Sequence, residues 1–176
     1  MEKINKLKRI LKSMGINGYI IPKNDEFFGE YIPDQKDRLK YISDFTGSYG
    51  IALILNSANY LFVDGRYTLQ SNKQSGKLFK IKTIPKELPN KVLGNKKLKI
   101  GFDPKLFTKK SLNIFFGKTN CEYIPLKSNL IDKIWIRKRN KIKNKFYTLP
   151  PFSVGENYTS KINKVFSKLK KIKGDY

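Results

Sequence analysis

Apolar positions recur along the chain with two periods, one typical of helices and one typical of strands. Residues 2–14 place five apolar side chains on one stripe with lysines between them, which predicts an amphipathic helix that ends at Gly15. The apolar run of residues 19–22 predicts a buried strand, and a polar and aromatic loop over residues 23–35 follows it. A short helix is expected over residues 36–44.

Two apolar runs of strand length then lie close together. Residues 51–55 and residues 60–63 are separated by a short Asn/Ser connection, and this pattern predicts a β-hairpin. The second run ends abruptly at Asp64-Gly65-Arg66, and a helix-like segment follows. A fixed charge on a glycine turn at a strand end is a common way to build a binding site.

The rest of the first 135 residues alternates between the two periods. We expect helices over residues 67–75, 109–116 and 129–135, and strands over residues 78–84, 98–103 and 121–125. Thr108 and Asn129 have the side chains to cap the helices that follow them, and residues 86–94 are expected to form a short helix or loop interrupted by Pro89. This alternation predicts an α/β fold, with a sheet flanked by helices.

The composition changes after residue 132. Residues 133–147 hold seven basic residues and no acidic one, and prolines follow, as expected for an inter-domain linker. Apolar residues then recur at helical spacing between Ile162 and Ile172. We therefore predict one domain over residues 1–150, and a linker with the first helix of a truncated second domain over residues 151–176.

Length and composition indicate one domain, or one domain plus a piece of another. The chain has 176 residues, of which 39% are apolar, enough for an ordinary core. No apolar run approaches the roughly 20 residues that span a bilayer, and the N-terminus lacks the pattern of a signal peptide. The single cysteine, Cys121, fits a reducing compartment and a structural role. These features predict a cytoplasmic protein with no membrane partner.

The net charge of +23 raises the question of a polyanion partner. Only five of the 37 basic residues are arginines, although nucleic-acid readers usually depend on arginine. The lysines are also spread along the whole sequence. A lysine-rich solvated surface is the favoured interpretation, and weak binding of nucleic acid or another polyanion stays as an alternative.

Histidine is absent from the sequence. Its absence removes the commonest general base, the Ser-His and Cys-His pairs and the usual zinc ligands. The acidic residues Glu30, Asp34 and Asp37 crowd one loop, but they lack a calcium-loop pattern and are expected to form a solvated surface rather than a metal site. Catalysis by this chain alone is not expected.

Arg66 is the candidate site residue. Its guanidinium can bind a carboxylate or a peptide backbone, and Gly65 would let the ligand approach closely. Spacing alone favours a simpler interpretation, a type I′-like turn with a surface arginine and a local ion pair to Asp64.

Several short motifs, taken in their order, resemble the N-terminal domain of Xaa-Pro aminopeptidases, the aminopeptidase P branch of the creatinase/prolidase superfamily. They are Tyr19-Ile20-Ile21-Pro22, Asp25, Glu30-Tyr31, Asp44-Phe45-Thr46-Gly47-Ser48 with Gly50, Val63-Asp64-Gly65-Arg66-Tyr67 with Leu69-Gln70, Gly101-Phe102-Asp103-Pro104, Asn129 to Trp135, and Lys161 to Gly174. Each piece is weak alone, but together they cover almost the whole chain.

The resemblance implies a ribonuclease-H-like α/β fold, with a mixed sheet flanked by helices, for residues 1 to about 150. It implies a metal-dependent enzyme, usually with two manganese ions, that removes an N-terminal residue preceding proline. The metal ligands of such enzymes lie in a C-terminal domain that this sequence does not include, so no cofactor is expected in this chain. What carries over is a substrate-binding role for Arg66.

The resemblance therefore predicts a fragment that is non-catalytic alone. In the full enzyme it would restrict access to peptides with proline at the second position and help to pack subunits into a homo-oligomer. The alternative is a stand-alone module that binds a protein or peptide, because the same fold occurs without catalysis in a histone-chaperone subunit.

Overall fold

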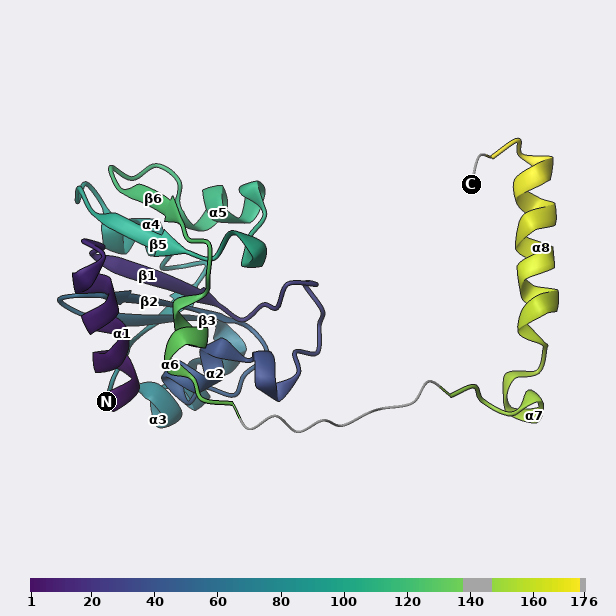
Figure 1. Cartoon of the computed structure of the whole chain (residues 1–176), viewed down its shortest axis with the longest axis horizontal. Helices are drawn as coiled ribbons and strands as arrows, with labels where there is room; N and C mark the ends of the chain where they lie inside the picture. Colours follow the sequence, from purple (N-terminus) through teal and green to yellow (C-terminus); the bar gives the residue numbers. More distant parts are fainter. Residues whose placement is uncertain (138–146, 175–176) are drawn as a thin grey trace. The chain divides into compact units, whose positions relative to one another are not determined.

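The computed structural model describes residues 1–137 and 147–174 (Figure 1). The chain divides into two compact units, Met1–Lys138 and Arg139–Tyr176. The boundary predicted near residue 150 stays a prediction, and residues 138–146 of the predicted linker lie outside the described residues.

The first unit is built on a six-stranded mixed sheet, which confirms the predicted fold class. The strand order is β4-β3-β2-β1-β5-β6. The central pairs β1–β2 and β2–β3 are antiparallel, whereas β3–β4, β1–β5 and β5–β6 are parallel. The strands are β1 (Gly18–Pro22), β2 (Gly50–Leu55), β3 (Asn59–Asp64), β4 (Lys80–Ile84), β5 (Lys99–Phe102) and β6 (Glu122–Pro125).

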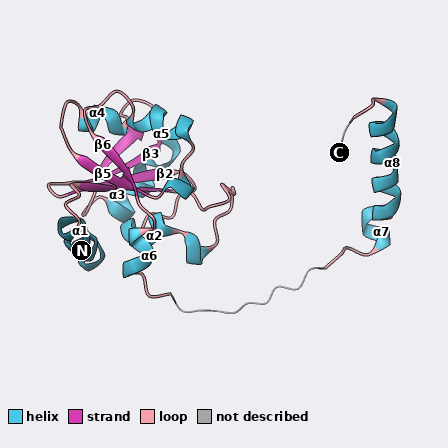
Figure 2. Ribbon diagram, turned by 45° about the horizontal axis from the view of Figure 1, so that its top comes forward, coloured by secondary structure: helices cyan, strands magenta, loops and turns pink. Residues whose placement is uncertain are grey.

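Helices cover both faces of this sheet (Figure 2). The α-helices are α1 (Glu2–Ser13), α2 (Arg38–Ser43), α3 (Thr68–Ser75), α4 (Pro89–Leu93), α5 (Lys109–Phe116) and α6 (Leu130–Ile134). Within the described residues, short 3-10 turns also occur at Asp34–Lys36, Gly65–Tyr67 and Pro104–Leu106.

The central strands separate two hydrophobic cores, because successive strand residues point to opposite faces. On β1, Tyr19 and Ile21 pack in the core beneath α1, α2 and α6, while Ile20 packs in the core beneath α4 and α5. On β2, Ile54 and Leu53 divide in the same way. Because both faces of these strands are buried, their sequences are continuous apolar runs and do not alternate between apolar and polar residues.

Local signals in the sequence fix several element ends. The Thr108 side chain caps α5 by accepting a hydrogen bond from the Ser111 backbone N–H at 3.0 Å, and the Thr108 backbone N–H donates to the Ser111 hydroxyl at 3.0 Å. Asn129 caps α6, because its side-chain oxygen accepts a hydrogen bond from the Ile131 backbone N–H at 3.0 Å. Pro89 begins α4 instead of interrupting it, so this expectation was wrong: the first turn of a helix needs no N–H at that position.

The second unit contains α7 (Pro151–Val154) and α8 (Tyr158–Lys171). The helical spacing predicted α8, whereas α7 was not predicted. Ile162, Val165 and Ile172 are 47%, 57% and 73% exposed, so much of the apolar stripe faces solvent in this unit. None of the helices within residues 1–137 and 147–174 combines the length and the hydrophobicity that a membrane span requires.

Replacing Thr108 with alanine is expected to lower the free energy of unfolding by about 1 kcal/mol, because it removes a helix cap. Thr108→Ser keeps the capping hydroxyl and serves as the matched control. Urea denaturation measures the free energy of unfolding of both variants. An equal loss of unfolding free energy in the two would contradict the role assigned to the cap.

Candidate functional site

Arg66 lies directly after β3, at the end of the sheet where β1 also ends and β2 begins. Asp64 caps the Gly65–Tyr67 turn by accepting a hydrogen bond from the Arg66 backbone N–H at 2.9 Å. Gly65 does not adopt a left-handed backbone, and a Cβ at this position would meet nothing within 4 Å. The predicted type I′-like geometry was therefore wrong, because that turn needs positive φ at its central residues.

The Arg66 guanidinium pairs with the Asp64 carboxylate. Its Nη2 donates to Asp64 Oδ2 at 2.6 Å, and its Nε lies 3.2 Å from both carboxylate oxygens. The arginine side chain is 75% exposed and the aspartate side chain 24%. The hydrogen bond from Arg66 holds the pKa of Asp64 below its usual value. The local ion pair expected from spacing is thus present, with the guanidinium open to solvent.

Tyr67 supports the turn from the side of the hairpin. Its hydroxyl lies 2.7 Å from Ser48 Oγ, and its ring packs edge-on against Phe45, with centroids 5.8 Å apart. The Ser48 hydrogen bond lowers the pKa of Tyr67. A Cβ on Gly47 would lie 2.3 Å from the Phe45 ring and 2.9 Å from the Tyr67 ring, so this close packing requires glycine.

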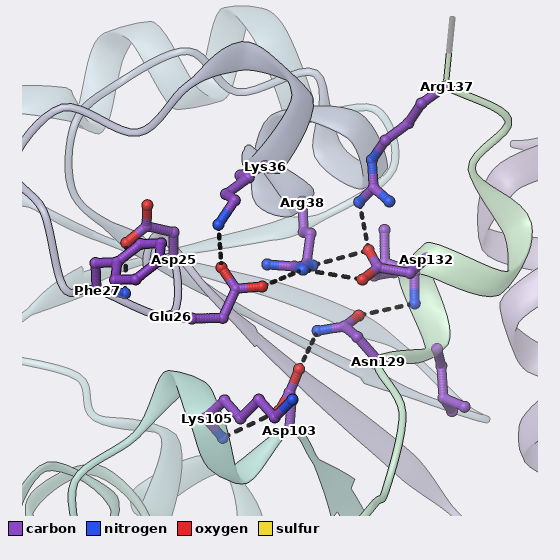
Figure 3. Close-up of polar contacts among 12 residues, drawn as sticks. Asp25, Glu26, Phe27, Lys36, Arg38, Asp103, Lys105, Asn129, Asp132 and Arg137 are labelled. Atoms are coloured by element: carbon purple, nitrogen blue, oxygen red, sulfur yellow. Dashed lines mark hydrogen bonds and ion pairs between the residues drawn. The ribbon is translucent and has the colours of Figure 1, made fainter. Parts of the chain in front are cut away.

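A polar network that sequence reasoning missed occupies the same end of the sheet (Figure 3). Arg38, at the start of α2, is 5% exposed and donates two hydrogen bonds to Asp132 on α6, at 2.8 and 2.9 Å. Its Nη2 also donates to Glu26 at 3.0 Å, and Lys36 donates to the other Glu26 oxygen at 2.9 Å. Arg137 also donates to Asp132, at the same Oδ1 oxygen that accepts from Arg38 Nε.

These contacts favour the ionised forms of the Glu26 and Asp132 carboxylates. Burial alone would raise the pKa of Glu26, but the hydrogen bonds from Lys36, its own backbone and Arg38 lower it to about 2. Burial likewise opposes ionisation of Asp132, and the hydrogen bonds from Arg38 and Arg137 more than offset it, so its pKa is lowered. Both groups therefore stay charged in the folded chain at neutral pH.

One member of the predicted acidic loop is not solvated. Asp37 is 6% exposed, caps α2 through the Lys40 backbone N–H at 3.0 Å, and pairs with Lys23 at 2.5 Å. The solvated interpretation was wrong for Asp37, because the carboxylate begins a helix and neutralises a lysine whose side chain is only 9% exposed. Glu30 and Asp34 are exposed as expected. Within residues 1–137 and 147–174, no three His, Cys, Asp or Glu side chains gather where they could hold a metal ion.

Two further polar residues fix the backbone around the network. Asp25 is buried and accepts hydrogen bonds from the Phe27 and Gly29 backbone N–H groups at 3.0 and 3.3 Å. Asn129 donates to Asp103 at 2.9 Å, which links α6 to the end of β5. The motifs that contain Asp25, Asp103 and Asn129 were visible in the sequence, but nothing in the sequence indicated these pairings.

The stability of the chain is expected to fall as the pH drops from about 5 towards 2. A carboxylate with a depressed folded pKa contributes stability above its unfolded pKa, about 4.3 for Glu, and loses it as the pH falls through the folded value of about 2. Glu26→Gln should therefore lower the unfolding free energy by about 2 kcal/mol at pH 7 and flatten its dependence on pH. Denaturant melts across this range measure both effects.

Glu30→Gln is the matched control, because the exposed Glu30 has no ion pair in the part of the chain that the structure describes. It should leave the pH dependence unchanged. Equal pH profiles for Glu26→Gln and the unmodified chain would contradict the role assigned to the network.

Comparison with known proteins identifies the first unit. Residues 3–134 match the Creatinase/Prolidase N-terminal domain family. The Probable Xaa-Pro aminopeptidase P of Coprinopsis cinerea is 31% identical over 96% of this chain, and the Xaa-Pro aminopeptidase 1 of Dictyostelium discoideum is 28% identical over 99% of it. The chain spans 29% and 30% of the lengths of these two relatives.

Solved structures show the same fold. The X-prolyl aminopeptidase of Caenorhabditis elegans, described as a cytosolic enzyme with a di-nuclear active site, is similar over 98% of this chain and 31% of its own, with a TM-score of 0.67 and 24% identity. The N-terminal domain of the cytoplasmic peptidase PepQ from Mycobacterium tuberculosis is similar over 76% of this chain and 98% of its own, with a TM-score of 0.56 and 21% identity. By its sequence match and its fold, the chain belongs to the creatinase/prolidase N-terminal domain family.

Proposed function

We propose that this chain forms the N-terminal, non-catalytic part of a metal-dependent Xaa-Pro aminopeptidase. The observation that carries the proposal is the similarity to the Coprinopsis cinerea Xaa-Pro aminopeptidase P, which extends over 96% of the chain at 31% identity. The metal chemistry would come from a further domain that holds two ions, manganese in our proposal. The cleaved peptide would carry proline at its second position.

In this proposal Arg66 binds the peptide substrate. Asp64 engages Nε and Nη2 of the guanidinium, and Nη1 makes no hydrogen bond among the residues described. A carboxylate or carbonyl oxygen of a peptide can accept from that free edge. The open space beside Gly65 leaves room for the peptide backbone to approach.

In the full enzyme, the loop before α2 would limit access to the active-site cleft and pack against other parts of the enzyme. It exposes three aromatic side chains, Phe27, Phe28 and Tyr31, which are 79%, 47% and 88% exposed. Asp25 holds the backbone of this loop, and Lys36 lies over the Phe27 ring at 4.5 Å. Exposed aromatic side chains on an ordered loop are typical of protein contacts, and we propose a cytoplasmic homo-oligomer as the full assembly.

The same aromatic loop favours the second candidate, a stand-alone module that binds a protein or peptide. The two functions differ in what Arg66 does. In an aminopeptidase the loss of Arg66 weakens productive substrate binding. In a stand-alone binding module Arg66 has no part in peptide hydrolysis, so its loss would leave hydrolysis unchanged even after the module is fused to a metal domain.

A hybrid enzyme tests the role of Arg66. Residues 1–134 of this chain would replace the matching segment of the Coprinopsis cinerea relative. Arg66→Ala in this hybrid is expected to raise KM for an Xaa-Pro tripeptide about tenfold, with a smaller change in kcat, because a ground-state contact is lost. Steady-state kinetics with the tripeptide measure both constants.

Lys73→Ala is the matched control, because this exposed cation of α3 makes no ion pair among the described residues. It should leave KM unchanged. Arg66→Lys keeps the charge but lacks the planar guanidinium, so its KM should lie between the KM values of Arg66→Ala and Lys73→Ala. A KM for Arg66→Ala equal to that of Lys73→Ala would contradict the proposed role.

A further inference from the structure

A second polar surface lies at the end of the sheet opposite the end where β3 leads into Arg66. Here β1 and β5 begin and β2 ends. The Asn17 backbone N–H donates to the Lys99 carbonyl at 2.8 Å, and the Asn56 backbone N–H donates to the Asn17 carbonyl at 3.1 Å. These bonds hold the β2–β3 turn beside the start of the central strands.

A surface hollow lies between this turn and α1. Its lining residues are Asn5, Lys8, Arg9, Lys12 and Asn56. The four residues from α1 are spaced i, i+3, i+4 and i+7, so they share one face of the helix. The apolar stripe of α1, which includes the buried Ile4, Leu7 and Leu11, is anchored in the core. The fold therefore fixes the direction in which the polar face points.

The hollow concentrates positive charge without compensation. Two other lysines of α1 have acidic partners, Lys3 with Asp44 and Lys6 with Glu2. In contrast, Lys8, Arg9 and Lys12 make no ion pair with any residue in the described ranges, and no described carboxylate lines the hollow. Like charges one helical turn apart repel, so a bound anion would relieve this repulsion.

One lysine is already held in place. The Lys8 Nζ donates to the Asn56 carbonyl oxygen at 3.2 Å, which ties it to the floor of the hollow. Partial burial lowers the pKa of Lys8, because the charged form has lost some of its water. An anion in the hollow would replace that lost solvation.

We propose that this hollow binds a phosphate-bearing anion. Two lysine ammonium groups and one arginine fork match the several charges and outward oxygens of a di- or triphosphate. The side-chain amides of Asn5 and Asn56 can donate further hydrogen bonds to phosphoryl oxygens. The same chemistry is offered by free polyphosphates and by the backbone of a single-stranded nucleic acid. The site is independent of the role proposed for Arg66.

Titration of the ¹⁵N-labelled 176-residue chain with inorganic tripolyphosphate at physiological salt tests the site. We expect the amide resonances of α1 and Asn56 to show the largest chemical-shift changes and these changes to saturate as tripolyphosphate is added. The variant Lys8→Gln/Arg9→Gln/Lys12→Gln should weaken binding at least about tenfold. The matched control Lys105→Gln/Lys109→Gln/Lys110→Gln removes the same charge from exposed positions at the other end of β5, and its affinity should stay within about twofold of the parent chain.

An equal loss of tripolyphosphate affinity in the two triple variants would overturn the proposal, because binding would then depend only on the net charge of the chain. The absence of saturable binding, with the spectra showing a folded chain, would also overturn it. So would an aspartate-rich peptide that binds this hollow more tightly than tripolyphosphate. A parallel titration with oligothymidine distinguishes the two sources. The source is the ligand that binds the parent chain more tightly and that loses affinity in the α1 variant but not in the control.

Discussion

The buried guanidinium of Arg38 is the interaction on which the polar end of this domain depends. A charge removed from water must be paired, because leaving it unpaired costs several kcal/mol. Arg38 meets this need with two hydrogen bonds to Asp132, 94 residues away, and one to Glu26 in the loop before α2. The pairing joins α2, α6 and the aromatic loop at the end of the sheet to which β3 brings Arg66.

Much of the fold could be predicted from the sequence because its signals are local. Apolar periodicity predicted α1, the β2–β3 hairpin and α8, and Thr108 and Asn129 marked the starts of their helices. The Arg38 network could not be found in this way, since no local pattern links residues 38 and 132. Asp37 was misjudged for a related reason: a charged loop residue appears solvated until the lysine that pairs with it, Lys23, is placed beside it.

The candidate site at Arg66 could be predicted only in part from the spacing of its residues. Spacing favoured a turn with a local ion pair, and the structure contains that pair between Asp64 and Arg66. What distinguishes this turn is its surroundings: a guanidinium open to solvent, space beside Gly65, and a rigid support from Tyr67 and Ser48. The proposed substrate role depends on these features together with the family to which the chain belongs.

The most direct test of the central claim is a peptidase assay on the 176-residue chain with manganese and an Xaa-Pro tripeptide. We predict no hydrolysis above the blank, because the proposal assigns the metal ligands to another domain. Hydrolysis that depends on manganese and disappears in Arg66→Ala would contradict this account, since it would place the catalytic chemistry in this chain.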